Sequence, residues 1–161
     1  MLTVRASHCA PTQASRHETA WELLYTAIEE EYGIPREALT FVRNENGKPV
    51  CTSHPDIWFS ITHGTDCAAI ALSDAPVGID CEKRRAVPSR VRSRVLGLDG
   101  EGDGEEALVR WCEMESYAKY KGGVVFGMEY GETMEQALRE CVFMRSDALG
   151  DDCVLILCIP K

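Results

Sequence analysis

The chain has 161 residues, 45% of them hydrophobic, and a formal net charge of −9 at pH 7. This size and composition suit one compact domain, 1–161, and exclude fibrous or disordered chains. The negative charge disfavours nucleic acid and anionic membranes as partners. Because no apolar leader follows Met1 and the longest aliphatic run, 153–159, is too short to cross a bilayer, we expect a soluble cytoplasmic protein.

The eight cysteines form no C-x-x-C pair, and most of them stand among apolar residues. In a cytosolic protein this pattern favours reduced thiols that pack as small hydrophobic side chains. A structural zinc site is the less favoured alternative. The cysteines are Cys9, Cys51, Cys67, Cys81, Cys112, Cys141, Cys153 and Cys158.

The N-terminal part of the chain predicts a short strand over 1–7 and then a helix. Ser15 and Glu18 have capping-box spacing, and the apolar stripe that follows them ends at Gly33. Arg16 falls in the first turn, where a cation opposes the helix dipole. An anion bound at the free amides would explain this arginine, and a solvated surface position is the alternative.

Three strands are expected before the centre of the chain. The first, 39–43, leads into a tight turn at Asn46-Gly47. Strands at 57–63 and 67–73 follow and are joined at a glycine. The strands at 57–63 and 67–73 should form a three-stranded meander with the strand that follows them. This meander would bring His63 close to a pair of acidic residues.

That next strand, 77–85, carries two carboxylates on one face. Alternation directs its apolar residues toward a core and leaves Gly78, Asp80 and Glu82 on the opposite face. Two like charges side by side usually persist because a cation or a shared proton lies between them, and oxygen ligands suit Mg²⁺ or Mn²⁺. Gly78, which has no side chain, should leave room for a ligand.

A helix over 105–121 supplies a third acidic residue. Its expected start is Asp103, and two glycines follow its end. A helical wheel places Glu115 and Lys119 inside the apolar face. A buried carboxylate and amine need partners, such as a metal at Asp80 and Glu82, although an internal ion pair between Glu115 and Lys119 is the alternative.

The remaining segments read more simply. Residues 83–94 form a basic island without an acidic residue, which is typical of a solvated surface. Residues 97–104 read as a loop. Strands are expected over 124–130, 140–145 and 153–159, so that the order of helix followed by strands occurs twice.

Four motifs together carry a resemblance to a known family. Gly78-Ile79-Asp80-Cys81-Glu82 and Trp111-Cys112-Glu113-Met114-Glu115-Ser116-Tyr117-Ala118-Lys119 are similar to the signature motifs G-I-D-x-E and W-x-x-K-E-S/A-x-x-K of the 4'-phosphopantetheinyl transferase superfamily. Asn46-Gly47-Lys48-Pro49 and Phe59-Ser60-Ile61-Thr62-His63 resemble the G-K-P and F-N-I-S-H segments of its surfactin-synthetase-activating type. The resemblance spans roughly Arg16 to Lys119, in a shortened form of that type.

The resemblance implies an α+β fold of two pseudo-symmetric helix-plus-antiparallel-sheet halves, about 1–82 and 83–161, in a monomeric chain. It implies Mg²⁺-dependent (Mn²⁺ possible) transfer of the 4'-phosphopantetheine group from coenzyme A to a serine of an apo acyl or peptidyl carrier protein. The two alternatives are a catalytically weak or inactive homologue that binds coenzyme A or a carrier protein, and an unrelated Mg²⁺-dependent phosphohydrolase.

The resemblance also implies roles for individual residues. The expected metal ligands are Asp80, Glu82 and Glu115. The expected catalytic residues are Glu115, Asp80, Lys119 and His63. The expected contacts to coenzyme A are Arg16, Lys48, Thr62, His63 and Lys119. An acidic carrier protein should dock on the basic island, at Lys83, Arg84, Arg85, Arg90, Arg92 and Arg94. Met114 stands where the family usually has a lysine.

Overall fold

The computed structural model describes residues 1–98, 104–125 and 127–161. Its helices and antiparallel sheets give an α+β architecture, as predicted. The elements in chain order are β1 (Leu2–His8), α1 (Gln13–Tyr32), a 3₁₀ turn (Arg36–Ala38), β2 (Phe41–Arg43), β3 (Pro49–Cys51), β4 (Trp58–His63), β5 (Cys67–Ser73), β6 (Gly78–Lys83), α2 (Ser89–Arg94), α3 (Gly104–Tyr120), α4 (Tyr130–Glu140), β7 (Cys141–Arg145) and β8 (Cys153–Pro160).

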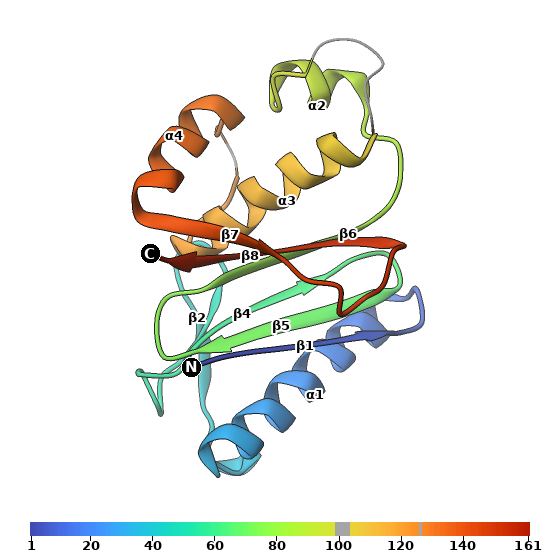
Figure 1. The fold of residues 1–161 in the computed structure, drawn as a ribbon. Helices are drawn as coiled ribbons and strands as arrows, with labels where there is room; N and C mark the ends of the chain where they lie inside the picture. The colour runs from blue at the N-terminus through green and yellow to red at the C-terminus, as the bar shows by residue number, and fades with distance from the viewer. Residues whose placement is uncertain (99–103, 126) are drawn as a thin grey trace.

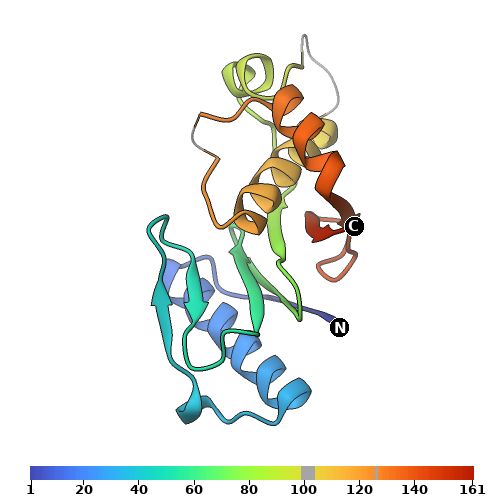
Figure 2. The ribbon, with the colours of Figure 1, turned by 90° about the vertical axis from the view of Figure 1, so that its left-hand side faces the viewer.

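Two antiparallel sheets lie between two layers of helices (Figure 1). The first sheet has the strand order β1-β5-β4 and packs on α1, and the second has the order β6-β8-β7 and packs on α3. Apolar side chains of β5, β6 and β8 form the core between the sheets. Figure 2 shows the short β2–β3 hairpin beside α1 and the first sheet.

The first helix begins earlier than its sequence pattern suggested. Thr12, in an extended conformation, is the capping residue, and its hydroxyl accepts a hydrogen bond of 3.2 Å from the amide of Ser15. The prediction that Ser15 caps the helix was therefore wrong by one turn. Its end at Gly33 is confirmed, because this glycine has φ +66° and its amide bonds to Glu29 O.

The expected meander is wrong in its third strand. The hairpin of β4 and β5 forms as predicted, but β6 pairs along its length with β8. The strand with the two carboxylates thus belongs to the second sheet, although our division near residue 82 placed it in the first half. The reason is non-local, since β8 is an almost wholly buried strand that requires neighbours on both edges.

The C-terminal region contains a helix that we did not predict. The expected strand over 124–130 is absent from the described part of that range, and α4 begins at Tyr130 instead. Met134 and Ala137 of α4 pack with Tyr117 of α3 in one apolar cluster. The strands expected at 140–145 and 153–159 are confirmed as β7 and β8.

Other expectations have simpler outcomes. All eight cysteines are free thiols, and seven of them are buried, as predicted. The helix α3 ends before Gly122, which has φ +74°, whereas its expected cap, Asp103, and most of the loop expected over 97–104 lie outside the described residues. Among the helices of the described ranges, none combines the length and the apolar character needed to span a bilayer.

Candidate functional site

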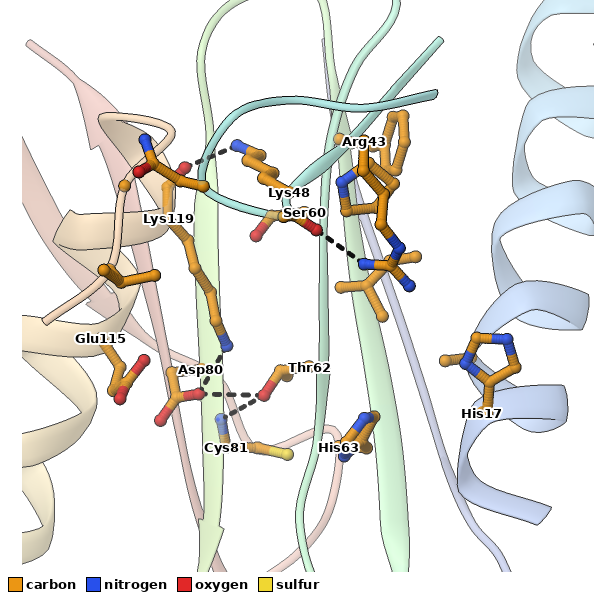
Figure 3. Close-up of a pocket in the computed structure, with 18 of the residues that line it drawn as sticks. His17, Arg43, Lys48, Ser60, Thr62, His63, Asp80, Cys81, Glu115 and Lys119 are labelled. Carbon is orange, nitrogen blue, oxygen red and sulfur yellow. Dashed lines mark hydrogen bonds and ion pairs between the residues drawn. The ribbon is translucent and has the colours of Figure 1, made fainter. Parts of the chain in front are cut away.

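Residues of all four motifs line one pocket of about 430 Å³ between β4, β6 and α3 (Figure 3). The β2–β3 turn and α1 complete its wall. The predicted site residues that line it are Lys48, Thr62, His63, Asp80, Glu82, Glu115 and Lys119. The fold thus brings Lys48 into direct hydrogen-bond contact with Lys119, which lies 71 residues further along the chain.

Asp80 lies at the centre of the acidic side of the pocket, which we define as Asp80, Glu82 and Glu115. Its Oδ1 accepts a hydrogen bond of 3.0 Å from Thr62 Oγ1 and an ion pair of 2.8 Å from Lys119 Nζ. The side chain is only 8% exposed. Its buried Oδ2 has no hydrogen-bond partner among the described residues, which leaves a buried carboxylate oxygen open to a ligand.

The two glutamates of the acidic side are half-buried and repelled by Asp80. Burial, followed by the charges of Asp80 and Glu82, raises the pKa of Glu115. Burial also raises the pKa of Glu82, against the attraction of Arg85, which lies 3.2 Å from it. Burial opposes the charge of Lys119, but Asp80 and Glu115 outweigh burial and raise the pKa of this lysine. The direct partner of Lys119 is Asp80, whereas the alternative of an ion pair between Glu115 and Lys119 is not found between these two described residues.

The acidic side fits a hard divalent cation in its chemistry. It offers carboxylate oxygens alone, and one of them, Asp80 Oδ2, is buried without a partner. In the described ranges, no three His, Cys, Asp or Glu side chains stand close enough together to hold a metal ion as they are. The proposed ligand set is therefore supported by its donor type and by the open oxygen, not by preformed coordination.

Gly78 serves the packing of a helix, so the prediction that it leaves room for a ligand was wrong. A Cβ atom at this position would lie 1.8 Å from Ser116 O and 2.6 Å from Tyr120 N. Both atoms belong to the backbone of α3, which cannot yield as a flexible side chain can. The glycine therefore lets α3 lie directly against β6 and brings Glu115 and Lys119 to Asp80.

Lys48 lines the pocket, but its ammonium group contacts backbone carbonyls. Its Nζ donates to Lys119 O at 2.6 Å and to Val77 O at 3.2 Å. Burial and the nearby charge of Lys119 lower the pKa of Lys48 to about 8. These contacts link the β2–β3 turn to the end of α3 and to the start of β6.

His17, Arg43 and His63 line the pocket opposite the acidic side (Figure 3). Together with the nearby Arg16, they form what we define as the basic side. Arg16 does not line the pocket itself; its Nη1 donates to Gly64 O at 2.9 Å, and its buried Nε has no partner among the described residues. Burial, followed by the charges of Arg16, Lys119 and His17, lowers the pKa of His63. Near neutral pH, the His63 imidazole is therefore neutral.

Sequence reasoning missed His17 and Arg43. Arg43 ends β2, and its Nη1 donates to Gly47 O at 2.6 Å, which directs the side chain back over the β2–β3 turn. His17 lies on α1 next to Arg16 in sequence. Their proximity to the motif segments is the signal that could have identified them.

The basic island is more neutralised than its sequence suggested. Lys83 pairs with Asp66 at 2.5 Å, Arg84 with Glu105 at 2.5 Å and Arg85 with Glu82. The expectation that Arg92 is available for docking was wrong, because this residue is buried with 8% exposure. Arg90 and Arg94, on α2, are exposed.

Known proteins with similar sequences agree with the motifs. The 4'-phosphopantetheinyl transferase psf-1 of Bacillus pumilus is 31% identical over 116 residues, which cover 66% of this chain and 50% of the relative. The 4'-phosphopantetheinyl transferase Sfp of Bacillus subtilis (strain 168) is 26% identical over 109 residues, 62% of this chain and 49% of the relative. The 4'-phosphopantetheinyl transferase gsp of Aneurinibacillus migulanus is 44% identical over 98 residues, 55% of this chain and 40% of the relative.

The matches leave part of each relative uncovered: the chain spans half or less of the length of these curated relatives. No protein-family model matches the sequence. The sequence matches and the structure nevertheless agree. Several relatives that match the chain are 4'-phosphopantetheinyl transferases, and residues of the four motifs line a single pocket. On these grounds the chain is homologous to proteins of the 4'-phosphopantetheinyl transferase family, in particular to those of the Sfp type.

Proposed function

We propose that this protein transfers the 4'-phosphopantetheine group from coenzyme A to a serine hydroxyl of an apo acyl or peptidyl carrier protein. The observation that carries the proposal is the convergence of the four motif segments on one pocket with an acidic and a basic side. A diphosphate donor carries negative charge, and it requires both cationic contacts and a counterion for the charge that develops on its leaving group.

The basic side is the proposed binding site for the phosphates of coenzyme A. Arg16 offers an unpartnered buried Nε, and the neutral His63 offers one ring N–H group. Arg43 lines the pocket and adds a guanidinium group. We expected further contacts to coenzyme A from Lys119, Thr62 and Lys48. Of these, Lys119 lines the pocket and pairs with Asp80 of the acidic side.

The acidic side is the proposed site for Mg²⁺, with Mn²⁺ as a substitute. Asp80, Glu82 and Glu115 would hold the ion, in agreement with their oxygen donors and with the open Oδ2 of Asp80. When bound, the ion supplies Lewis acidity and neutralises negative charge on the diphosphate. Burial first and then repulsion by Asp80 raise the pKa values of the two glutamates, and binding of the ion should relieve that repulsion.

The chain's own groups suit the proton transfer that the reaction needs. The serine oxygen forms a bond to the phosphorus that bears the pantetheine arm, and the bond from that phosphorus to the bridging oxygen breaks. The released product is 3',5'-adenosine bisphosphate. Glu115, whose pKa is raised by burial and by Asp80, is the proposed acceptor of the serine proton, because a base works best with a pKa near the operating pH.

Carrier docking is proposed at the basic island, which includes α2. Arg90 and Arg94 of α2 are exposed, and the ion-paired cations Lys83, Arg84 and Arg85 precede them in the chain. Contacts of this kind weaken with added salt. We also propose that residues 1–161 act as one monomeric domain, with the two sheet-and-helix halves related by pseudo-symmetry.

One experiment separates this function from the two alternatives. The protein is incubated with coenzyme A, Mg²⁺ and a panel of apo carrier proteins, and intact masses are measured. Transfer predicts that one carrier gains a 4'-phosphopantetheine group and that adenosine bisphosphate appears in equal amount. Binding of coenzyme A without mass gain indicates an inactive homologue, and cleavage of coenzyme A without a carrier indicates a phosphohydrolase; either result contradicts the proposal.

A further inference from the structure

The strands β4 and β6 lie side by side along the floor of the pocket, but they belong to different sheets (Figure 3). Two hydroxyl groups of β4 meet the amides of β6. Ser60 Oγ accepts a hydrogen bond of 3.2 Å from the Ile79 amide, and Thr62 Oγ1 accepts one of 3.2 Å from the Cys81 amide. Side-chain oxygens thus occupy the positions that carbonyl oxygens would take in a backbone ladder.

Two lysines donate to carbonyl groups of β6 and of Val77, the residue just before it. Lys48 Nζ donates to Val77 O at 3.2 Å, and Lys119 Nζ donates to Ile79 O at 3.1 Å. Four backbone groups of residues 77–81 are therefore satisfied by side chains from β4, α3 and the turn before β3. Because a side chain is longer than a direct backbone contact, this arrangement holds the strands apart while it fixes their register.

Thr62 differs from the other three groups, because it contacts a carboxylate of the acidic side as well as the backbone. A threonine hydroxyl has one proton to donate and two lone pairs. The proton is used on Asp80 Oδ1 and one lone pair on the Cys81 amide. What remains is a lone pair, which repels a phosphate oxygen.

We propose that Thr62 is a positioning residue for Asp80 and makes no contact with a phosphate of the donor. It holds Oδ1 of the carboxylate together with Lys119, so that Oδ2 stays available to the metal ion. This inference rests on the proposed function for its metal, and it replaces the donor-binding role that the family resemblance suggested for Thr62. Partners of this kind, which orient a ligand residue, are typically worth 10-fold to 100-fold in metal affinity.

The test compares Thr62→Val, which keeps the shape of the side chain, with Thr62→Ser, which keeps the hydroxyl. Calorimetry on the unreacted protein measures the affinities for Mn²⁺, for coenzyme A and for 3'-dephospho-coenzyme A. We expect Thr62→Val to weaken Mn²⁺ binding by roughly 10-fold or more and Thr62→Ser to restore it. The ratio between the affinities for the two donors, measured without metal, should be unchanged in both variants.

A direct phosphate contact predicts the opposite pattern and would overturn the proposal. In that case Thr62→Val lowers the affinity for coenzyme A more than for its dephospho form and leaves Mn²⁺ binding intact. Unchanged Mn²⁺ binding in a folded Thr62→Val protein also overturns it. Thr62→Ala provides a second variant if the valine protein does not fold.

Coupling to Asp80 makes the test independent of turnover. In an Asp80→Asn background, the valine substitution should cause no further loss of Mn²⁺ affinity, whereas additive losses would show that Thr62 acts elsewhere. If only the proposed function is wrong, the affinities for Mn²⁺, coenzyme A and 3'-dephospho-coenzyme A still follow the expected pattern, but no carrier protein gains mass.

Discussion

On the acidic side of the pocket, two adjoining elements supply the functional groups, whereas on the basic side they come from several separate segments. Asp80 and Glu82 lie on β6, and Glu115 lies on α3, which packs directly against that strand. Arg16 and His17 lie on α1, whereas Arg43 and His63 lie at the ends of two strands. The acidic side is partly or wholly buried, and most of the basic side is exposed.

This difference indicates which side is organised before a ligand arrives. Asp80 is held by two side chains, and its surroundings already shift the pKa values of Glu82, Glu115 and Lys119. The arginines of the basic side instead donate to loop carbonyls that a bound anion could displace. We therefore expect substitutions on the acidic side to change stability strongly, and substitutions on the basic side to change mainly the affinity for the donor.

Gly78→Ala should have the largest effect, because it separates the two elements of the acidic side. The added Cβ would lie 1.8 Å from a backbone oxygen of α3. We expect a loss of about 3 kcal/mol or more, or a protein that does not fold. Urea unfolding of this variant and of Gly131→Ala provides the measurement.

Gly131 is the matched control, since it lies in α4 with nothing within 4 Å of an added Cβ. Its replacement by alanine should leave stability unchanged or raise it by about 0.5 to 1 kcal/mol. If Gly78→Ala were as stable as Gly131→Ala, the close approach of α3 to β6 would be wrong.

Met114→Lys tests whether the family's usual lysine can join the acidic side here. Met114 is fully buried in the apolar cluster between α3 and α4, so a lysine would lose its hydration without gaining a partner. We expect the unfolding free energy to fall by about 2 to 3 kcal/mol with no gain in transfer rate. Met114→Leu should lose less than about 1.5 kcal/mol. A stable lysine variant with faster transfer would place this position beside the phosphates.

Glu115→Gln should stabilise the metal-free protein near neutral pH, because it removes a half-buried charge that Asp80 repels. The pKa of Glu115 is raised above its ordinary value of 4.5, so its stabilising effect is fully present below pH 4.5 and is lost as the pH rises through the raised pKa. The difference between variant and wild type should therefore vanish below pH 4.5. Mg²⁺ should stabilise only the wild type strongly. Thermal unfolding across pH, with and without Mg²⁺, checks both statements; a variant less stable at pH 7 would contradict them.

Arg43→Gln should have the smallest effect and should act on affinity alone. Loss of this exposed cation should weaken coenzyme A binding roughly 3-fold to 10-fold and reduce the dependence of binding on salt. The unfolding free energy should change by less than about 0.5 kcal/mol. The control is Arg139→Gln. The Arg139 side chain, on α4, is 77% exposed, and its replacement should leave coenzyme A binding unchanged. Equal effects of the two substitutions would remove Arg43 from the basic side.

Local patterns were sufficient for much of the acidic side. Alternation along β6 and the 3.6-residue period of α3 predicted which faces carry Asp80, Glu115 and Lys119, because those periods depend on neighbouring residues alone. The same reasoning could have found α4, where Tyr130, Met134 and Ala137 have helical spacing. The apolar residues just before it were read as a strand instead.

Contacts between distant segments were beyond local patterns. The pairing of β6 with β8 and the contact of Gly78 with the α3 backbone depend on how the layers pack. The same holds for Lys48, whose side chain reaches carbonyls 29 and 71 residues away. For the basic side, no continuous motif joins Arg16, Arg43 and His63, so only the fold brings them together.

The most direct test of a pocket with two cooperating sides is the binding of coenzyme A, measured by calorimetry with and without Mg²⁺. If the acidic side holds the ion that neutralises the diphosphate, Mg²⁺ should strengthen coenzyme A binding about 10-fold or more in the wild type and should have little effect in Glu115→Gln. Binding of coenzyme A that is equally strong with and without Mg²⁺ in the wild type, or equally enhanced by Mg²⁺ in the variant, would contradict this account.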